Sequence, residues 1–255
     1  MGNTATREAA KLLFQARKTG VKLDGFPPGL KPGSMDDVWA IIAEMDAMIP
    51  EPIAGYKFHK KPTQAQLCFA PLYASRIFAS PARVPIALAS TLAVEAEICF
   101  RLKRDLPARG TAYGDEEVFD AFEACVAFEV VDSRFADLRH MVTTALNDVY
   151  ADHMANGAFV FGTWCDDWRT MDFTKTRVTM AQGETYVADQ IGGHPNGNPA
   201  GALPIFVNEM RTQSGLKAGM PIATGSFTSW RPVEADREIT AAFEGFGEAK
   251  MSIVR

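Results

Sequence analysis

The chain lacks long apolar runs and a basic stripe, and each absence excludes a class of protein. No apolar run approaches the roughly 18 residues that a membrane-spanning helix needs, so we expect no membrane span. The formal net charge is −5 and the basic residues are scattered, so the sequence predicts no basic patch of the kind that binds nucleic acid. We therefore expect neither a membrane nor a nucleic acid as a partner.

Closely spaced cysteines are missing too. Cys68, Cys99, Cys125 and Cys165 are widely separated and show no Cys-x-x-Cys spacing. This pattern is typical of a reduced chain rather than of a disulfide framework. The first 20 residues carry charges where a signal peptide would have its apolar stretch, so secretion is not expected. Together these features predict a cytoplasmic protein.

Several catalytic motifs are also absent from the sequence. His59, His140, His153 and His194 form no His-Glu-x-x-His motif and no close pair of metal ligands. There is no Gly-x-Ser-x-Gly elbow, so a serine triad of the α/β-hydrolase type has no support. The glycines of residues 192–199 lack the spacing of a nucleotide-binding loop.

What the chain does contain is enough apolar material for a substantial core. Of its 255 residues, 47% are apolar and 22% are charged, which is typical of a globular protein. Residues 4–19 and 35–49 have the apolar spacing of helices, and Ser34 is a good N-cap for the second. Residues 115–124 and 198–214 predict two further helices.

Most of the remaining chain predicts strands. Residues 94–102 and 127–131 are apolar and β-prone. Residues 176–190 and 237–254 each have the pattern of a hairpin, with turn residues between two alternating runs. Helices and strands that fall in separate parts of the chain are typical of the α+β class.

Three carboxylates lie within the β-prone runs. Glu95 and Glu97 are two residues apart, so both side chains leave the strand by the same face. Converging with Glu129 of the second run, they would form a hard-oxygen site of the kind that Mg²⁺ or Mn²⁺ prefers. Alternatively, Glu95 and Glu97 form the solvated face of a half-buried strand, and Glu129 pairs with an arginine. Spacing alone leaves both interpretations open.

Two segments carry motifs of a known family. VEAEICFRLKRDL, followed by FEVVDSRFAD, contains a Glu-x-Glu pair and a later Glu just ahead of Asp-Ser-Arg. KAGMPIATGSFTSW contains a Gly-Ser-x-Thr segment. In these motifs the chain resembles the 2-keto-4-pentenoate hydratase and 2-oxo-3-hexenedioate decarboxylase family, within the fumarylacetoacetase-like superfamily. The resemblance extends from about Val94 to the C-terminus and is patchier before it.

The resemblance implies a complete catalytic site. Its ligands for Mg²⁺ or Mn²⁺ would be Glu95, Glu97 and Glu129. Lys57, which matches the family's Gly-aromatic-Lys, would be the catalytic proton donor. Ser226 and Thr228 would hydrogen-bond the carboxylate of the substrate. Asp132 and Arg134 follow the third carboxylate, and either an ion pair between them or a functional role is open.

The implied function is that of a metal-dependent lyase, a hydratase or a decarboxylase, acting on a small 2-oxo or 2-hydroxydienoic acid in aromatic catabolism. Leu72 stands where the family often has an aspartate, and residues 58–61 replace the family's usual loop. These departures leave the exact reaction open. One alternative is a related superfamily hydrolase or 2-oxo-acid decarboxylase, favoured if His59 faces the metal. The other is a non-catalytic subunit that partners an active paralogue.

The resemblance also implies an architecture. An N-terminal helical and mixed region with an active-site loop, residues 1–85, would pack on a larger, mostly β fumarylacetoacetase-like domain, residues 86–255. Family members assemble as oligomers, so we expect a homo-oligomer or a complex with a paralogue of the same pathway.

Overall fold

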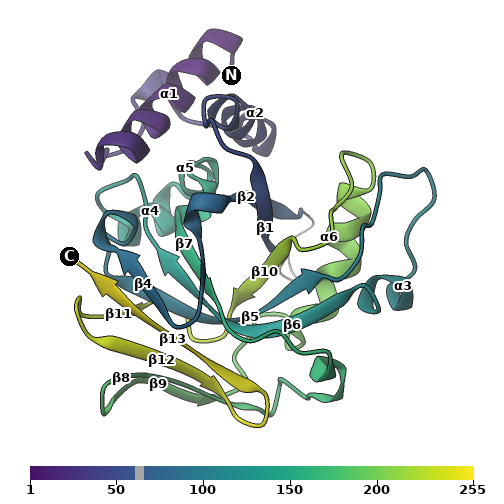
Figure 1. The fold of residues 1–255 in the computed structure, drawn as a ribbon. Coiled ribbons are helices and arrows are strands. Elements are labelled where there is room, and N and C mark those ends of the chain that lie inside the picture. The colour runs from purple at the N-terminus through teal and green to yellow at the C-terminus, as the bar shows by residue number, and fades with distance from the viewer. Residues whose placement is uncertain (61–65) are drawn as a thin grey trace.

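Two helices at the N-terminus form a layer on one side of the molecule (Figure 1). The computed structural model describes residues 1–60 and 66–255, so Lys61 of the altered loop lies outside the described residues. Helices α1 (Asn3–Thr19) and α2 (Met35–Asp46) pack against each other. Ser34 caps α2 as predicted, because its hydroxyl accepts from the backbone N–H of Asp37 while the Asp37 carboxylate accepts from Ser34.

The larger sheet runs through the centre of the molecule and has the strand order β2-β1-β10-β5-β6-β7-β3, with β11 paired to β5. Its strands are β1 (Ile53–His59), β2 (Cys68–Tyr73), β3 (Ile77–Ala79), β5 (Ala93–Leu102), β6 (Phe122–Val131), β7 (Asn156–Phe161), β10 (Pro221–Ser226) and β11 (Arg231–Pro232). Strands β5 and β6 pair antiparallel over their full length. Because β1 pairs with β10, the strand that carries Lys57 joins the sheet that carries the glutamates.

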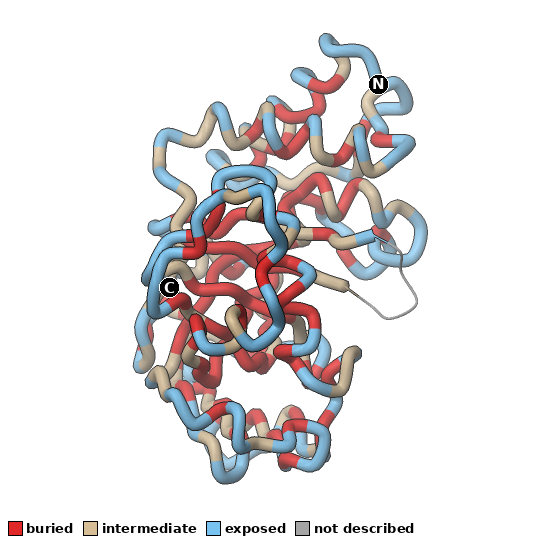
Figure 2. Tube along the Cα trace, turned by 90° about the vertical axis from the view of Figure 1, so that its right-hand side faces the viewer, coloured by how far each residue is buried: buried red, intermediate tan, exposed pale blue. Residues whose placement is uncertain are grey.

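The smaller sheet has the strand order β4-β13-β12-β8-β9. Its strands are β4 (Ala82–Pro85), β8 (Arg177–Gln182), β9 (Thr185–Ile191), β12 (Glu238–Phe243) and β13 (Gly247–Val254). Strands β12 and β13 contact β6, so the two sheets enclose the main hydrophobic core. Figure 2 shows this buried interior in red, below the helical layer. Both predicted hairpins, β8–β9 and β12–β13, are present, and the α+β prediction is confirmed.

The remaining helices are short. They are the α-helices α3 (Asp115–Phe119), α4 (Leu138–Thr144), α5 (Leu146–Ala151) and α6 (Leu203–Met210), and the 3₁₀ helices η1 (Pro28–Leu30), η2 (Ala74–Arg76), η3 (Ile86–Leu88), η4 (His153–Ala155), η5 (Asp167–Thr170) and η6 (Pro199–Ala202). The helix predicted over 115–124 was too long, because the chain from Phe122 onward pairs with β5. The helix predicted over 198–214 begins as η6 and continues as α6. Within the described ranges, no helix combines the length and apolar character needed to cross a membrane.

Candidate active site

The three glutamates that the sequence singled out lie together on one face of the larger sheet. Glu95 is directly opposite Glu129 in the β5–β6 register, and Glu97 is two residues further along β5. One carboxylate oxygen from each lies within 4.8 Å of the others. Glu97 is only 1% exposed and Glu95 is half-buried, so the interpretation of these two as a solvated strand face is wrong. Glu129 is 3% exposed. Glu129 pairs with a lysine rather than with an arginine.

Burial and mutual repulsion dominate the electrostatics of this cluster. Burial, followed by the charge of Glu129, raises the pKa of Glu95 to about 7. The same two causes raise the pKa of Glu97 well above its usual range. Lys57 supplies a single positive charge against three carboxylates. A buried, oxygen-only donor set with excess negative charge fits a hard divalent cation such as Mg²⁺ or Mn²⁺.

Lys57 reaches the cluster from β1. Its ammonium group forms an ion pair with Glu129 and donates a hydrogen bond to the Met154 carbonyl oxygen at 3.1 Å. The residue is 7% exposed, so these contacts hold the charge inside the protein. His59, two residues along the same strand, lines the same cavity and is half-buried.

The cavity beside the cluster has a volume of about 520 Å³ and a lining of mixed character. The glutamates and Lys57 belong to its polar lining, together with further polar side chains such as His59 and Asn196. The wall contributed by α4 and α5 is almost entirely apolar: it consists of Leu138, Val142, Leu146, Val149 and Tyr150, and Trp230 belongs to the same lining. Such a shape suits a small ligand with one acidic head and an apolar tail.

The Gly-Ser-x-Thr segment has two distinct parts in the structure. Ser226 lies opposite Glu97 and lines the cavity. Its buried hydroxyl makes no hydrogen bond of normal geometry with the described residues. It is nevertheless close enough to Glu95 to favour the charged form of that carboxylate. The Thr228 hydroxyl instead accepts from the Ala96 backbone N–H at 3.0 Å and donates to a backbone carbonyl. Thr228 does not line the cavity, so its contacts do not support the predicted substrate contact.

Gly225 brings the backbone of the same segment to the glutamates. The β10–β5 register shifts between Ala223 and Ser226, which marks a bulge next to the site. Gly225 adopts a φ of 115°, a conformation open to glycine, and its N–H donates to Glu97 at 3.3 Å. The bulge therefore adds a backbone donor to the carboxylate cluster.

Three further site residues were not predicted from the sequence. The carbonyl of Met154 contacts Lys57, and the Asn156 side chain donates to Glu129 at 3.4 Å. Asn196 lines the cavity with a buried side-chain oxygen that has no hydrogen-bond partner among the described residues. No sequence motif indicates these residues, which lie in η4 (Met154), at the start of β7 (Asn156) and in a turn (Asn196).

The structure also places Asp132, Arg134 and Leu72. Asp132 and Arg134 do not pair with each other: Asp132 pairs with Lys22 at 2.8 Å, and Arg134 pairs with Asp152. Leu72, at the position of the family's aspartate, is 1% exposed and belongs to an apolar cluster whose other members lie on β5, β6, β7 and β10. The protein interior has therefore adapted to an apolar side chain at position 72.

Known proteins resemble this chain in sequence over much of its length. No protein-family model matches the chain. The 2-keto-4-pentenoate hydratase of Paraburkholderia phymatum is 31% identical over 185 residues, which cover 72% of this chain and 69% of that protein. The 2-hydroxyhexa-2,4-dienoate hydratase of Comamonas testosteroni is 30% identical over 155 residues, covering 60% of this chain and 56% of that protein.

A solved structure shares the fold over nearly the whole length. It is 4-oxalocrotonate decarboxylase from Pseudomonas putida G7, complexed with magnesium and adipate, with a TM-score of 0.82. The alignment covers 99% of this chain and 98% of that one at 18% identity, so this likeness concerns the fold. With the sequence match to the hydratases, it shows that the chain belongs to the 2-keto-4-pentenoate hydratase and 2-oxo-3-hexenedioate decarboxylase family.

Proposed function

We propose that this chain is a metal-dependent lyase that hydrates a small 2-hydroxydienoic acid with an uncharged tail, as part of aromatic catabolism. The observation that carries the proposal is the cavity lined both by the three carboxylates and Lys57 and by an apolar wall. The names of the hydratase relatives support the same reaction class.

The carboxylate cluster is the proposed metal site. Glu95, Glu97 and Glu129 would hold Mg²⁺ or Mn²⁺, in keeping with their oxygen donors and their excess negative charge. When bound, such a cation supplies Lewis acidity for the keto and carboxylate oxygens of a 2-oxo acid. The buried Ser226 hydroxyl, on the wall of the same cavity, is the proposed hydrogen-bond donor to the substrate carboxylate.

Lys57 is the proposed proton carrier. A 2-hydroxydienoate becomes its keto tautomer when the enol oxygen loses a proton and a chain carbon gains one, with no net change in protons. Water then adds across the remaining double bond, its hydrogen to one carbon and its hydroxyl to the other. An ammonium group has three donors, and two of those on Lys57 are directed at Glu129 and the Met154 carbonyl. In the part of the chain that the structure describes, no hydrogen bond uses the third donor, which would serve the substrate carbon.

Thr228 takes a positioning role in this proposal. Its hydroxyl bridges the backbone of β5 at Ala96 and the backbone of its own segment at Ser229. Ala96 lies between Glu95 and Glu97, so this bridge fixes the strand that presents both carboxylates.

The apolar wall selects the tail of the substrate. A second carboxylate placed against Leu138 and Val149 would lose its hydration without a partner, which is strongly unfavourable. Lys60, on the cavity's edge, is the observation that favours the second candidate, decarboxylation of a 2-oxo dicarboxylic acid. Adipate, bound in the solved decarboxylase, is likewise a dicarboxylate, but it has no 2-oxo group.

A substrate panel tests the proposal. With Mg²⁺ or Mn²⁺ present, we expect loss of the dienoate absorbance for 2-hydroxypenta-2,4-dienoate and 2-hydroxyhexa-2,4-dienoate, and none after chelation of the metal. Release of CO₂ from 2-oxo-3-hexenedioate, lost in Lys60→Met, would favour the second candidate. Turnover of a 1,3-dicarbonyl acid that disappears in His59→Ala would favour the hydrolase. No turnover of any of these acids at saturating metal would contradict an enzyme of this class.

The cellular setting and assembly belong to the same proposal. We propose a cytoplasmic homo-oligomer, or a complex with a paralogue of the pathway. Four free cysteines, three of them buried, support a reducing compartment. Light scattering at micromolar concentrations measures the assembly, and a monomer throughout would contradict it.

A further inference from the structure

An unusual left-handed turn stands next to Lys57. His153, Met154 and Ala155 have φ angles of 48°, 56° and 57°. None of the three is glycine, and a left-handed conformation is unfavourable for residues with a Cβ atom. Single residues adopt it in many proteins, but three in succession need surrounding contacts that impose the conformation.

Arg134 supplies contacts at both ends of the turn. Its guanidinium donates to the carbonyl oxygens of Asp152 and Asn156, each at 2.9 Å, and also pairs with the Asp152 carboxylate. That carboxylate accepts further bonds from the Arg134 backbone N–H at 2.9 Å and from the Ser133 hydroxyl at 2.8 Å. Arg134 and Asp152 are 3% and 0% exposed, so water does not compete for these bonds.

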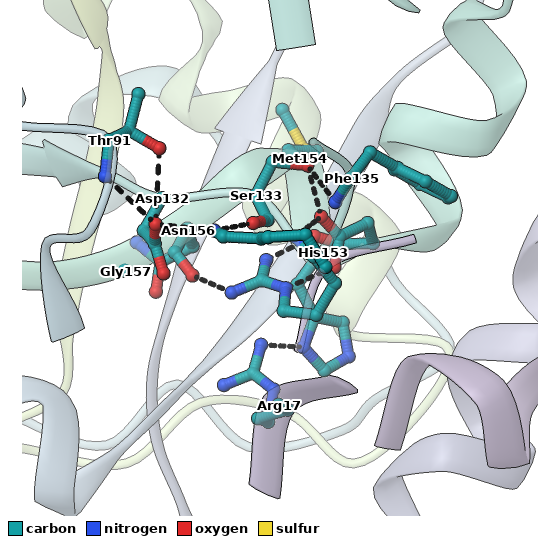
Figure 3. A network of polar contacts seen from close by, with 12 residues as sticks. Arg17, Thr91, Asp132, Ser133, Phe135, His153, Met154, Asn156 and Gly157 are labelled. Atoms are coloured by element: carbon teal, nitrogen blue, oxygen red, sulfur yellow. Dashed lines mark hydrogen bonds and ion pairs between the residues drawn. The ribbon is translucent and has the colours of Figure 1, made fainter. Parts of the chain in front are cut away.

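His153 fixes the first residue of the turn to the N-terminal helices. Figure 3 shows the Arg17 side chain beside the His153 ring, where it donates to Nδ1 at 3.0 Å. Because a guanidinium cannot accept, the ring proton is on Nε2, which donates to Asp46 at 2.9 Å. The turn is thus tied to α1 through Arg17 and to α2 through Asp46.

The turn in its left-handed form contacts both members of the Lys57–Glu129 pair. The Met154 carbonyl accepts from the Lys57 ammonium at 3.1 Å. Asn156, directly after the turn, donates to the Glu129 carboxylate at 3.4 Å. A turn of ordinary right-handed conformation would aim the Met154 carbonyl elsewhere, because reversing the sign of φ rotates the peptide plane.

We propose that Arg134 and His153 are positioning residues that hold the turn 153–155 so that its carbonyl directs the Lys57 ammonium toward the substrate. The inference rests on the proposed function in one respect, the assignment of proton transfer to Lys57. It gives a role to Arg134 of the Asp-Ser-Arg segment. It also gives a role to the N-terminal helices α1 and α2, which hold His153 through Arg17 and Asp46.

Two variants loosen the turn in different ways. Arg134→Lys keeps a positive charge beside Asp152 but loses the planar guanidinium that donates to the carbonyl oxygens of both Asp152 and Asn156. His153→Asn keeps a residue that tolerates positive φ but cannot reach Arg17 and Asp46 together, so it tests the inference even if Arg134→Lys does not fold. We expect kcat to fall about 10- to 100-fold in each, the range typical of misplaced catalytic groups, while KM and Mn²⁺ affinity change little.

Arg76→Lys is the matched control. Arg76 donates to the carbonyl of Gly157 at 3.1 Å, so it too binds a backbone carbonyl near the site, but outside the turn. We expect this variant to lose some stability and to keep its kcat. An equal loss of kcat in Arg76→Lys and Arg134→Lys would contradict a specific role for the turn.

A double-mutant cycle separates positioning from general damage. If the turn acts through Lys57, adding Arg134→Lys or His153→Asn to Lys57→Met should cause no further loss of turnover. If these residues only stabilise the fold, the loss should be the same in both backgrounds. Additive losses would therefore overturn the inference.

A measurement without substrate distinguishes failure of this inference from failure of the proposed function. The rate at which acetic anhydride acylates Lys57, followed by mass spectrometry of the peptide, reports how firmly the ammonium is held. We expect faster acylation of Lys57 in Arg134→Lys and His153→Asn than in the wild-type chain and Arg76→Lys. An unchanged rate would overturn the inference, whereas faster acylation in a chain that turns over no dienoate would overturn only the proposed function.

Discussion

At the scale of single residues, the site depends on buried charges that lack full compensation. Glu97 is 1% exposed and has Glu95 and Glu129 as neighbours. Burial, followed by the charge of Glu129, raises its pKa, so the folded chain without a metal is destabilised by this carboxylate. Glu97, which would hold a metal, therefore lowers the stability of the fold when no cation is bound.

Glu97→Gln tests this balance. The amide has nearly the same shape and no charge, so we expect the melting temperature of the metal-free variant to equal or exceed that of the wild type. Mn²⁺ affinity should fall by more than roughly 10- to 100-fold, which is the loss expected when only a hydrogen-bond partner of a metal ligand is removed. Calorimetric titration with Mn²⁺ measures the affinity. Glu123→Gln, on the neighbouring strand β6 and in an ion pair with Arg101 of β5, is the control that should bind Mn²⁺ normally. Normal binding by Glu97→Gln would contradict the site.

His153 gives the stability a defined pH dependence. Burial, the largest cause, lowers its pKa from 6.5 to about 4, with Arg17 and Arg134 adding to the shift and Asp46 opposing it. The unfolded chain binds this proton more readily, so the contribution is complete above about pH 6.5 and is lost as pH falls toward 4. We expect the free energy of unfolding to drop by roughly 2–3 kcal/mol between pH 7.5 and 4.5 through this residue. Urea titrations measure it, and His153→Asn should lack this component; equal slopes in both chains would contradict it.

At the scale of elements, strands β5 and β6 were predictable, and helices α4 and α5 were not. Alternation and β-prone residues identify β5 and β6, and the two-residue period alone places Glu95 and Glu97 on one face. Helices α4 and α5 have seven and six residues, too few to show a helical period, and are stabilised by packing against neighbouring segments. The turn 153–155 leaves no trace in the sequence, because contacts from distant residues impose it.

The apolar wall from α4 and α5 predicts a change of specificity. Leu146 is 40% exposed at the cavity edge, so Leu146→Lys should be tolerated and place an ammonium group near the tail of a substrate. We expect kcat/KM for a 2-oxo dicarboxylic acid to rise about tenfold relative to that for an uncharged dienoate, corresponding to roughly 1.4 kcal/mol from an ion pair at a partly buried site. Val21→Lys, at an exposed position outside the cavity wall, is the control. An unchanged ratio in Leu146→Lys would show that the tail does not lie against this wall.

At the scale of the whole molecule, strand pairing joins the two regions that the sequence analysis separated at residue 85. Strand β1 pairs with β10 and strand β4 pairs with β13, so residues 53–85 contribute to both sheets. The helical layer is tied to the rest through Arg17 and Asp46 at His153. A change of composition along the chain can suggest a boundary, but it does not reveal pairing between distant strands. The boundary therefore stays a prediction.

These pairings predict that the chain unfolds as one unit. Residues 86–255 expressed alone would expose the edge of β10 that β1 covers and the edge of β13 that β4 covers, and they would lose Lys57 as the partner of Glu129. Unpaired strand edges favour aggregation, so we expect the fragment to be insoluble. For the full chain, far-ultraviolet circular dichroism and tryptophan fluorescence should report the same midpoint in urea. Trp39 lies in α2 and Trp168 lies in the main core, so fluorescence samples both regions. A soluble 86–255 fragment with a cooperative transition of its own, or two separate midpoints for the full chain, would establish the boundary at residue 85 instead.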